Sequence, residues 1–481
     1  MKKIIYNIGT LAGILPADVR RLEGEAMNHV ECIEDAYLVI EDGIIAEFGE
    51  MSDSVFQDGT KDTVILNGMK DTVILNGTKW SEESLCGRSF ADAQDDRQGD
   101  AQDDRRSEGQ DDSRSATQDG RLKDRRRDGQ EGKTEYIDAK GGFVMPAFCD
   151  SHTHIVYAGC RDGEFRDKIA GLSYEEIAAR GGGILNSADL LHETSEDELY
   201  RQSMERVNEI MAMGTGAVEI KSGYGLTVED ELKMLRVIRR IKETSPVTVK
   251  ANFLGAHAVG RAYRGRQAEY VDLVCNEMLP KVAEEGLADY VDVFCDAGFF
   301  TVEETARILE KAAEFGIRPK IHANELEVSG GVQVGVRYNA LSVDHLEKTT
   351  DAEIEVLRGS ETMPTMLPGC SFFLGLPYGR AKEYIQAGLP VALASDYNPG
   401  SSPSGNMRFV MALGCIRMRL TPEQSFNACT INSAYAMGVS DILGSITIGK
   451  KANLIITKPI PSLAFISYSH QTPIIERVLI A

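Results

Sequence analysis

The sequence predicts an α/β fold, a TIM-type (β/α)8 barrel with a small β-sandwich-like domain built from both chain ends. From about residue 144, strand-like apolar runs alternate with helical periodicity, and eight such runs can be counted. Short strand-like runs with turn signals occur near both termini. We therefore expect a barrel at 144–435, an insertion at 57–135, and a small β domain formed by 1–56, 136–143 and 436–481.

The small β domain is predicted from two hairpin patterns. Residues 36–48 alternate as two strands around Asp42-Gly43, a dipeptide typical of tight hairpin turns. Residues 444–456 repeat the pattern around a turn at 449–451. One hairpin from each end of the chain should therefore contribute to this domain.

The insertion at 57–135 differs in composition from the rest of the chain. Residues 61–68 recur unchanged as 70–77, and the tract 81–134 has only Leu85, Phe90 and Leu122 as large apolar residues. Such a tract cannot bury enough apolar surface to offset its ordering entropy, so we expect a disordered insertion. An interaction arm is the alternative, and 63–66 and 72–75 could pair as an extra hairpin.

The barrel is predicted from eight apolar runs with helical segments, such as 229–244 and 302–315, between them. Polar residues that follow barrel strands lie at the end of the barrel that carries the active site. The predicted strands are 144–149, 217–220, 247–254, 290–295, 319–321, 340–343, 362–367 and 391–394.

Histidines and carboxyl groups gather after these predicted strands. Five of the eight histidines in the chain fall there, whereas His29, His192 and His470 are assigned to structure. The five are His152, His154, His257, His322 and His345. A single histidine after a predicted strand could be there by chance, but chance is a poor explanation for five.

The pair His152 and His154 indicates a metal site. Residues i and i+2 of a strand point to the same side, and imidazole is a common ligand of zinc and similar ions. His322 and Asp396 complete a set of four that leaves room for a water molecule. Asp396 is suited both to contact the metal and to take a proton from that water. A second metal is less expected, because no lysine follows the fourth strand as a bridging group.

Composition restricts the classes of partner. The net charge of −22 argues against nucleic acid and anionic membranes, and no apolar run is long enough to cross a bilayer. The nine cysteines form no C-x-x-C pair, which favours reduced thiols and a cytoplasmic location. We read the apolar N-terminus as a strand rather than a signal peptide.

Three segments, 219–226, 179–184 and 395–401, together with the metal-site pattern, resemble the amidohydrolase superfamily and, within it, the imidazolonepropionases. The resemblance covers nearly all of the chain except about 57–135. It implies hydrolysis of the cyclic amide of 4-imidazolone-5-propanoate to N-formimidoyl-L-glutamate, a step of histidine degradation. It also implies one zinc or iron ion held by the four groups named above, and a homodimer.

The resemblance also implies roles for individual residues. Arg161 would bind the propanoate carboxylate, Tyr224 and His257 would contact the substrate, and Glu325 would bind a ring nitrogen. His345 would help to activate the water or stabilise the oxyanion, and Asp396 or Glu325 would protonate the leaving nitrogen. Asn398, Gly400 and Ser401 would hold substrate or product.

Structural roles are the alternatives for four of these residues. Arg161 could instead pair with Asp162 or Glu164, and Tyr224 could only pack the barrel mouth. Glu325 could cap a helix or pair with a lysine, and His345 could be a hydrogen-bonded core residue.

Two other functions stay open at this point. One is a different amidohydrolase, such as a nucleobase aminohydrolase, against which Arg161 argues because a nucleobase has no carboxylate. The other is a barrel without catalysis, which would be expected to lack the metal ligands. Ala147 stands where amidohydrolases often have glycine, a mild departure.

Overall fold

The computed structural model describes residues 1–51, 63–65, 72–74, 134–172, 176 and 182–481. The chain divides into two compact units, one of Met1–Met51 with Lys133–Ala481 and one of Ser52–Gly132. In the second unit the described residues are β4 (Thr63–Ile65) and β5 (Thr72–Ile74), which pair antiparallel and confirm the extra hairpin. The predicted disorder of the insertion otherwise falls outside the described residues.

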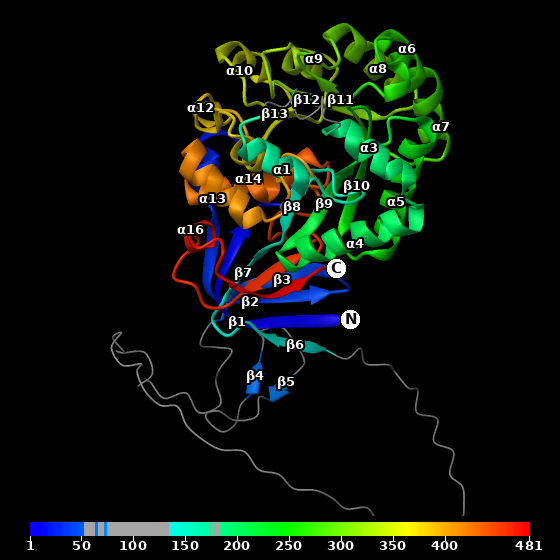
Figure 1. The fold of residues 1–481 in the computed structure, drawn as a ribbon. Coiled ribbons are helices and arrows are strands. Elements are labelled where there is room, and N and C mark those ends of the chain that lie inside the picture. Colours follow the sequence, from blue (N-terminus) through cyan, green and yellow to red (C-terminus); the bar gives the residue numbers. More distant parts are fainter. Residues whose placement is uncertain (52–62, 66–71, 75–133, 173–175, 177–181) are drawn as a thin grey trace, which may run out of the picture. The chain divides into compact units, whose positions relative to one another are not determined.

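A parallel eight-stranded sheet forms the barrel of the first unit, as predicted, with its strands in chain order from β8 to β15 (Figure 1). The amide of Asp396 donates to the carbonyl of His152, and the amide of His154 donates to the carbonyl of Tyr397. These bonds join the last strand region to the first and nearly close the barrel. The strands are β8 (Phe148–Thr153), β9 (Thr215–Lys221), β10 (Thr248–Ala256), β11 (Tyr290–Cys295), β12 (Arg318–Ala323), β13 (Ser342–His345), β14 (Met363–Met366) and β15 (Ala392–Leu393).

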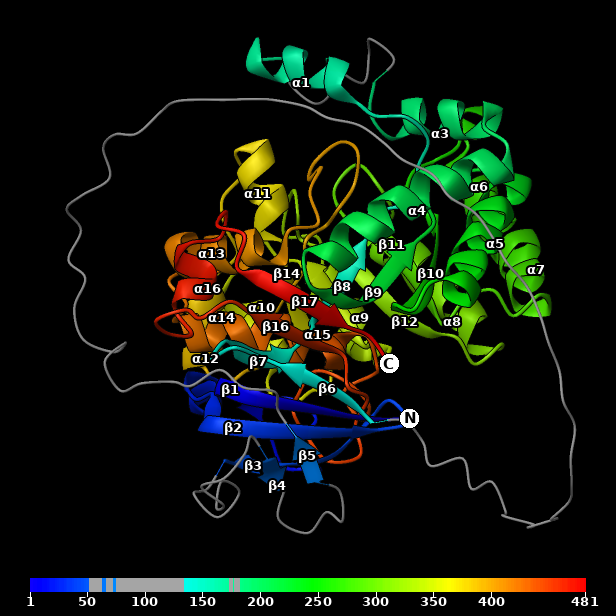
Figure 2. The ribbon, with the colours of Figure 1, turned by 90° about the horizontal axis from the view of Figure 1, so that it is seen from below.

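Helices surround the barrel strands in both views (Figures 1 and 2). Several begin at a residue whose side chain caps the helix, such as Thr301, which forms a capping box with Glu304 at the start of α8. The barrel helices are α1 (Asp162–Ile169), α3 (Ile184–Glu193), α4 (Glu196–Ala212), α5 (Val228–Thr244), α6 (Gln267–Leu273), α7 (Leu279–Glu284), α8 (Val302–Ala313), α9 (Gly331–Arg337), α10 (Asp351–Leu357), α11 (Pro368–Leu374), α12 (Ala381–Gln386), α13 (Met407–Met418), α14 (Pro422–Cys429) and α15 (Ile431–Ala436).

The small domain is a mixed sheet made from both ends of the chain, in the order β17-β16-β7-β1-β2-β3, with β6 beside β1. Some of its apolar side chains form a core of their own, whereas others, among them Met145 of β7 and Ile455 of β16, pack in the core cluster of the barrel. Asp42 and Gly43 both have positive φ, which matches the two-residue turn predicted there. The elements are β1 (Lys2–Ile14), β2 (Glu31–Glu41), β3 (Ile44–Glu50), β6 (Glu135–Asp138), β7 (Phe143–Pro146), β16 (Leu454–Thr457) and β17 (Ile475–Leu479), with helix α16 (Phe465–Tyr468) between the last two.

Two predictions about these strands are wrong. The run 144–149 is not one barrel strand, because the chain passes at Ala147 from β7 of the small sheet to β8 of the barrel. Proline at 146 has no amide hydrogen to continue a ladder, so the first strand ends there. The second error concerns 444–456, where the first half forms turns and β16 pairs instead with β17 and β7. Ile446 of that first half instead forms an isolated bridge with Ile14 of β1.

No helix within the described residues is both long enough and apolar enough to cross a membrane.

Candidate metal centre and active site

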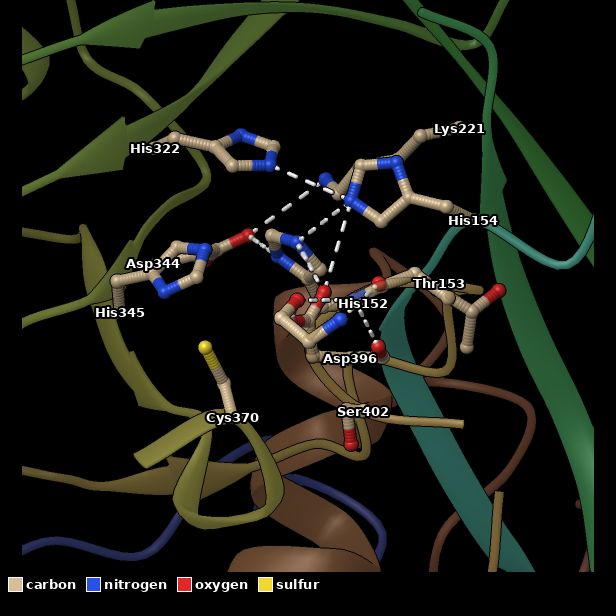
Figure 3. Close-up of polar contacts among 12 residues, drawn as sticks. His152, Thr153, His154, Lys221, His322, Asp344, His345, Cys370, Asp396 and Ser402 are labelled. Carbon is tan, nitrogen blue, oxygen red and sulfur yellow. Dashed lines mark hydrogen bonds and ion pairs between the residues drawn. The ribbon is translucent and has the colours of Figure 1, made fainter. Parts of the chain in front are cut away.

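Four groups from three parts of the barrel meet at one point (Figure 3). His152 and His154 belong to β8 and its C-terminal end, His322 to β12, and Asp396 follows β15. The Nε2 atom of His154 lies 3.3 Å from Nε2 of His152 and 3.4 Å from Nε2 of His322. Oδ1 of Asp396 lies 3.6 Å from Nε2 of both His152 and His154. The structure therefore brings the four predicted ligands together.

The atoms of this cluster suit a cation at its centre. Oδ1 of Asp396 is buried and has no hydrogen-bond partner among the described residues. Such an atom is costly unless something positive fills the place that it faces. Burial, together with Lys221 near His152 and His257 near His154, holds the pKa of both histidines well below its usual value. Neutral imidazole is the form that binds a metal.

Two further carboxylates fix the orientation of the histidine rings. Oδ2 of Asp344 lies 2.7 Å from Nδ1 of His152, and Oδ1 of Asp292 lies 3.1 Å from Nδ1 of His322. In His152, a proton on Nδ1 shared with Asp344 leaves Nε2 with a lone pair toward the common centre. Carboxylates behind ligating histidines are a recurrent feature of metal sites.

A buried charge network lies beneath the centre, and the sequence analysis missed it. Nζ of Lys221 lies 2.6 Å from Glu219 and 2.7 Å from Asp292. Lys320 pairs with Glu219 and donates to the carbonyl of Ser151 at 2.8 Å. None of these four charged side chains is exposed. Burial alone would raise the pKa of Asp292, but His322 and Lys221 hold it well below the usual value.

A sequence signal for this network existed. Polar or charged residues stand at alternate positions inside otherwise apolar strands, as in Glu219 and Lys221 of β9 or Lys320 and His322 of β12. Alternate residues share a face, so these charges had to point into the barrel together. Lys221 is the last residue of β9, one position beyond the end of the strand predicted at 217–220.

A cavity of about 810 Å³ opens beside the cluster, and of the twelve residues predicted for the site only His152 does not line it. The predicted residues along its wall are His154, Arg161, Tyr224, His257, His322, Glu325, His345, Asp396, Asn398, Gly400 and Ser401. Apolar side chains from α1 and α11 contribute, and Phe165 of α1 stacks on Phe373 of α11 with ring centres 5.4 Å apart.

Tyr224 and His257 lie on one side of the cavity, where a buried carboxylate holds their backbone. Oε1 of Glu231 accepts the amides of Gly225 at 2.7 Å and Leu226 at 3.0 Å, and Oε2 accepts that of Gly223 at 3.1 Å. The carbonyl of Gly223 in turn lies 3.0 Å from Nδ1 of His257. Glu231 therefore determines the shape of the turn that carries Tyr224.

Arg161 lines the cavity and is paired with Glu164, one of the alternatives considered from the sequence. Oε2 of Glu164 accepts from Nε of Arg161 at 2.9 Å and from Nη2 at 2.7 Å. The guanidinium group also lies against Gly400, where a side chain would overlap it. Arg161 therefore forms the ion pair with Glu164 and also lies in the cavity wall.

Glu325 and His345 also interact in the cavity wall. Nε2 of His345 lies 3.6 Å from Oε2 of Glu325, and Nδ1 lies 3.5 Å from Oε2 of Glu347. Burial raises the pKa of Glu325 to about 7. Burial opposes the charged form of His345, yet Glu325 and Glu347 raise its pKa to about 10. Asp296 accepts the amides of Glu325 and Leu326, at 2.7 and 2.9 Å, and so fixes this loop.

Asn398 is used within its own loop. Its Oδ1 accepts the amides of Gly400 and Ser401, each at 2.8 Å, and its Nδ2 donates at 2.7 Å to the carbonyl of Asp396 and to Oγ of Ser401. These four bonds use the whole capacity of the side chain. Asn398 therefore shapes the turn that presents Asp396, Gly400 and Ser401 to the cavity.

Backbone strain accompanies these positions. Asp396 has φ of 55° and His345 has φ of 86°, values that non-glycine residues seldom adopt. Such residues concentrate at functional sites, where the surrounding structure maintains them. A barrel with three converging histidines, a strained aspartate and an adjoining cavity defines a metal-dependent hydrolase of the amidohydrolase type.

Comparisons with known proteins agree with this class. The profile of the Amidohydrolase family matches residues 143–480. The imidazolonepropionase of Flavobacterium johnsoniae is 60% identical over 344 residues, which are 72% of this chain and 84% of that protein. The enzyme of the same name from Flavobacterium psychrophilum is 46% identical over 480 residues, covering 100% of this chain and 99% of that one. The chain belongs to the imidazolonepropionases of the amidohydrolase family.

Solved structures support the fold alone, because their sequences are distant. An adenosine deaminase from Xanthomonas campestris with bound zinc is 14% identical, with a TM-score of 0.61 over 99% of this chain and 91% of that one. A guanine deaminase from E. coli is 13% identical, with a TM-score of 0.62 over 100% and 98%.

Proposed function

We propose that this protein hydrolyses the cyclic amide of 4-imidazolone-5-propanoate to N-formimidoyl-L-glutamate, as a step of histidine degradation. The observation that carries the proposal is the convergence of three imidazoles and the unpartnered Oδ1 of Asp396 beside a cavity that also contains Arg161. The names of the relatives above support the choice of substrate.

The resident ion would be zinc or iron, held by His152, His154, His322 and Asp396. Such an ion supplies two effects when bound, a lower pKa of water and polarisation of a carbonyl group. The donor set of nitrogen and carboxylate oxygen suits both metals. We also propose a homodimer in the cytoplasm.

The residues of the chain would divide the hydrolysis between them. Asp396 takes a proton from the attacking water, whose oxygen bonds to the carbonyl carbon of the ring. His345, near Glu325 on the cavity wall, stabilises the negative charge that develops on the carbonyl oxygen. The ring C–N bond then breaks, and Asp396, directly or through Glu325, delivers the proton to nitrogen. The carbonyl carbon becomes a carboxylate.

The remaining residues would bind and orient the substrate. Arg161 would pair with the propanoate group, while Tyr224 and His257 would flank the ring. Gly400 and Ser401 would contact substrate or product from the turn that Asn398 shapes.

A spectrophotometric assay on freshly generated imidazolonepropanoate tests the proposal, with and without a chelator. The variant D396N should lose about 10²–10⁴-fold in kcat and keep its fold, which circular dichroism would verify. The exposed Asp351 of α10 offers a control, D351N, which should retain full activity. Release of ammonia from guanine or cytosine in place of ring opening would identify another amidohydrolase, and a normal kcat in D396N would refute the mechanism.

A further inference from the structure

Helix α1 presents two cationic side chains to the cavity. Arg161 is the residue that precedes the helix and Lys168 lies in its last turn, seven residues later. Residues seven apart lie on the same side of a helix, two turns from each other. Both side chains line the cavity, and both contact Gly400, which Lys168 reaches through a hydrogen bond of 3.0 Å from Nζ to the carbonyl oxygen.

The positive charge of Arg161 is largely compensated by Glu164. The pair has two bonds below 3.0 Å, and only 7% of the arginine and 13% of the glutamate side chain are exposed. Glu164 also accepts the amide of Gly183 at 3.0 Å, which holds it in place. An anion that meets Arg161 therefore meets a pair with little net charge.

Lys168 has no such compensation. None of the described carboxylates lies within ion-pair distance of its Nζ atom, which rests 4.8 Å from the centre of the Phe373 ring. Burial, and next to it the charge of Arg161, lower the pKa of Lys168, and the smaller opposing effects of Cys370, Glu164 and Glu325 do not offset them. The ammonium group has donors left for a ligand beyond the one that Gly400 uses.

The other charged groups along the cavity make this lysine important. Glu325, Glu327 and Asp396 contribute carboxyl groups to the wall, where His345 lies beside Glu325, and Arg161 and Lys168 are the arginine and lysine side chains of the lining. A carboxylate ligand would meet a negative surface on one side. Around Gly400 the cavity wall is positive instead of negative, and Lys168 supplies the net positive charge of that region.

We propose that Lys168 binds the carboxylate of the substrate together with Arg161, so that the anchor for this group consists of two cations. Arg161 supplies the planar donors and Lys168 the uncompensated charge. The inference rests on the proposed function, because it takes the ligand to be a small carboxylate. It assigns Lys168 a role in substrate selection rather than in the bond-breaking step.

Binding of a matched pair of probes separates this role from a purely structural one. Imidazolepropanoate and imidazolepropanamide differ only in the carboxylate, and calorimetry on the metal-loaded enzyme measures both affinities. K168Q should reduce the preference for the acid over the amide by about tenfold, the effect of one charge-assisted hydrogen bond. K168R should preserve most of the preference because it retains the charge.

The helix itself offers the matched control. Arg166 lies on α1, is exposed and does not line the cavity, so R166Q removes a charge from the same helix without touching the site. R166Q should leave both affinities unchanged. If K168Q weakens acid and amide equally, Lys168 only holds the Gly400 loop and the proposal is wrong. Wild-type protein that binds the acid through Lys168 but fails to open imidazolonepropanoate would refute the proposed function and leave the carboxylate anchor standing.

Discussion

Oδ2 of Asp344 lies 2.7 Å from Nδ1 of His152, and neither side chain is exposed. The carboxylate keeps the Nδ1 proton in place and thereby directs the lone pair of Nε2 to the metal centre. D344N should lower metal affinity about 10–100-fold, since an amide does not enforce that tautomer. Competition with a chromophoric chelator measures the affinity, and D351N serves as an exposed control. Equal affinities in D344N and the wild type would mean that the ring needs no such partner.

Glu231 lies outside the cavity wall but supports it. In E231Q only one side-chain oxygen can accept amides of the turn at 223–226, so at least one of the three hydrogen bonds is lost. The turn that supports both Tyr224 and His257 is then held less firmly. We expect about 1–3 kcal/mol lower free energy of unfolding and a reduced kcat/KM. Urea titration and steady-state kinetics measure the two effects. Glu229, in the same turn of α5 and largely exposed, provides the control E229Q, which should match the wild type.

Removal of the metal should destabilise the protein as well as inactivate it. The three imidazoles and Asp396 face one another, and without an ion the unpartnered Oδ1 of Asp396 stays buried. An ion at 1,000 times its Kd adds about 4 kcal/mol to the free energy of unfolding. Thermal unfolding before and after chelation, then after addition of zinc or iron, should show a fall and a recovery of Tm. Addition of metal to H322A should raise its Tm little. Full activity in the metal-free enzyme would contradict a role for the metal.

Lys450 makes stability depend on pH. Its Nζ is buried against Ser440, Leu443 and Ser445, and burial lowers its pKa to about 8 from 10.5. Between those values the unfolded chain binds a proton that the folded chain lacks, so this residue makes stability increase as pH rises from about 8 to about 10.5. Urea midpoints at about pH 7 and about pH 9.5 should show this contribution in the wild type and its loss in K450M. The partly exposed neighbour gives the control K451M.

The sequence predicted the barrel because its signal is repeated eight times and each repeat supports the others. It also predicted that the four groups proposed as metal ligands lie together, since His152 and His154 stand two apart and a parallel barrel brings all strand ends to one side. These are short-range rules, and they hold without knowledge of distant contacts.

The errors concern choices between partners. The change of sheet at Ala147 depends on Asn453, whose carbonyl accepts the Ala147 amide, and nothing near residue 147 reveals that contact. The turn predicted at 449–451 gives no sign that Lys450 is buried, whereas three acceptors around its Nζ atom make burial tolerable. The network of Lys221 and Lys320 was missed because each strand was considered alone, while the charges cancel only across strands.

The position of β1 has a consequence for the integrity of the subunit. This strand pairs with β2, β6 and β7, so residues 1–51 are joined to the rest of the first unit by backbone hydrogen bonds and a shared apolar core as well as by the polypeptide. A proteolytic nick anywhere within 52–132 would sever the covalent link but none of those bonds. The two fragments would then stay bound to each other in the native enzyme. They would separate only under denaturing conditions, where an electrophoresis gel would show two bands.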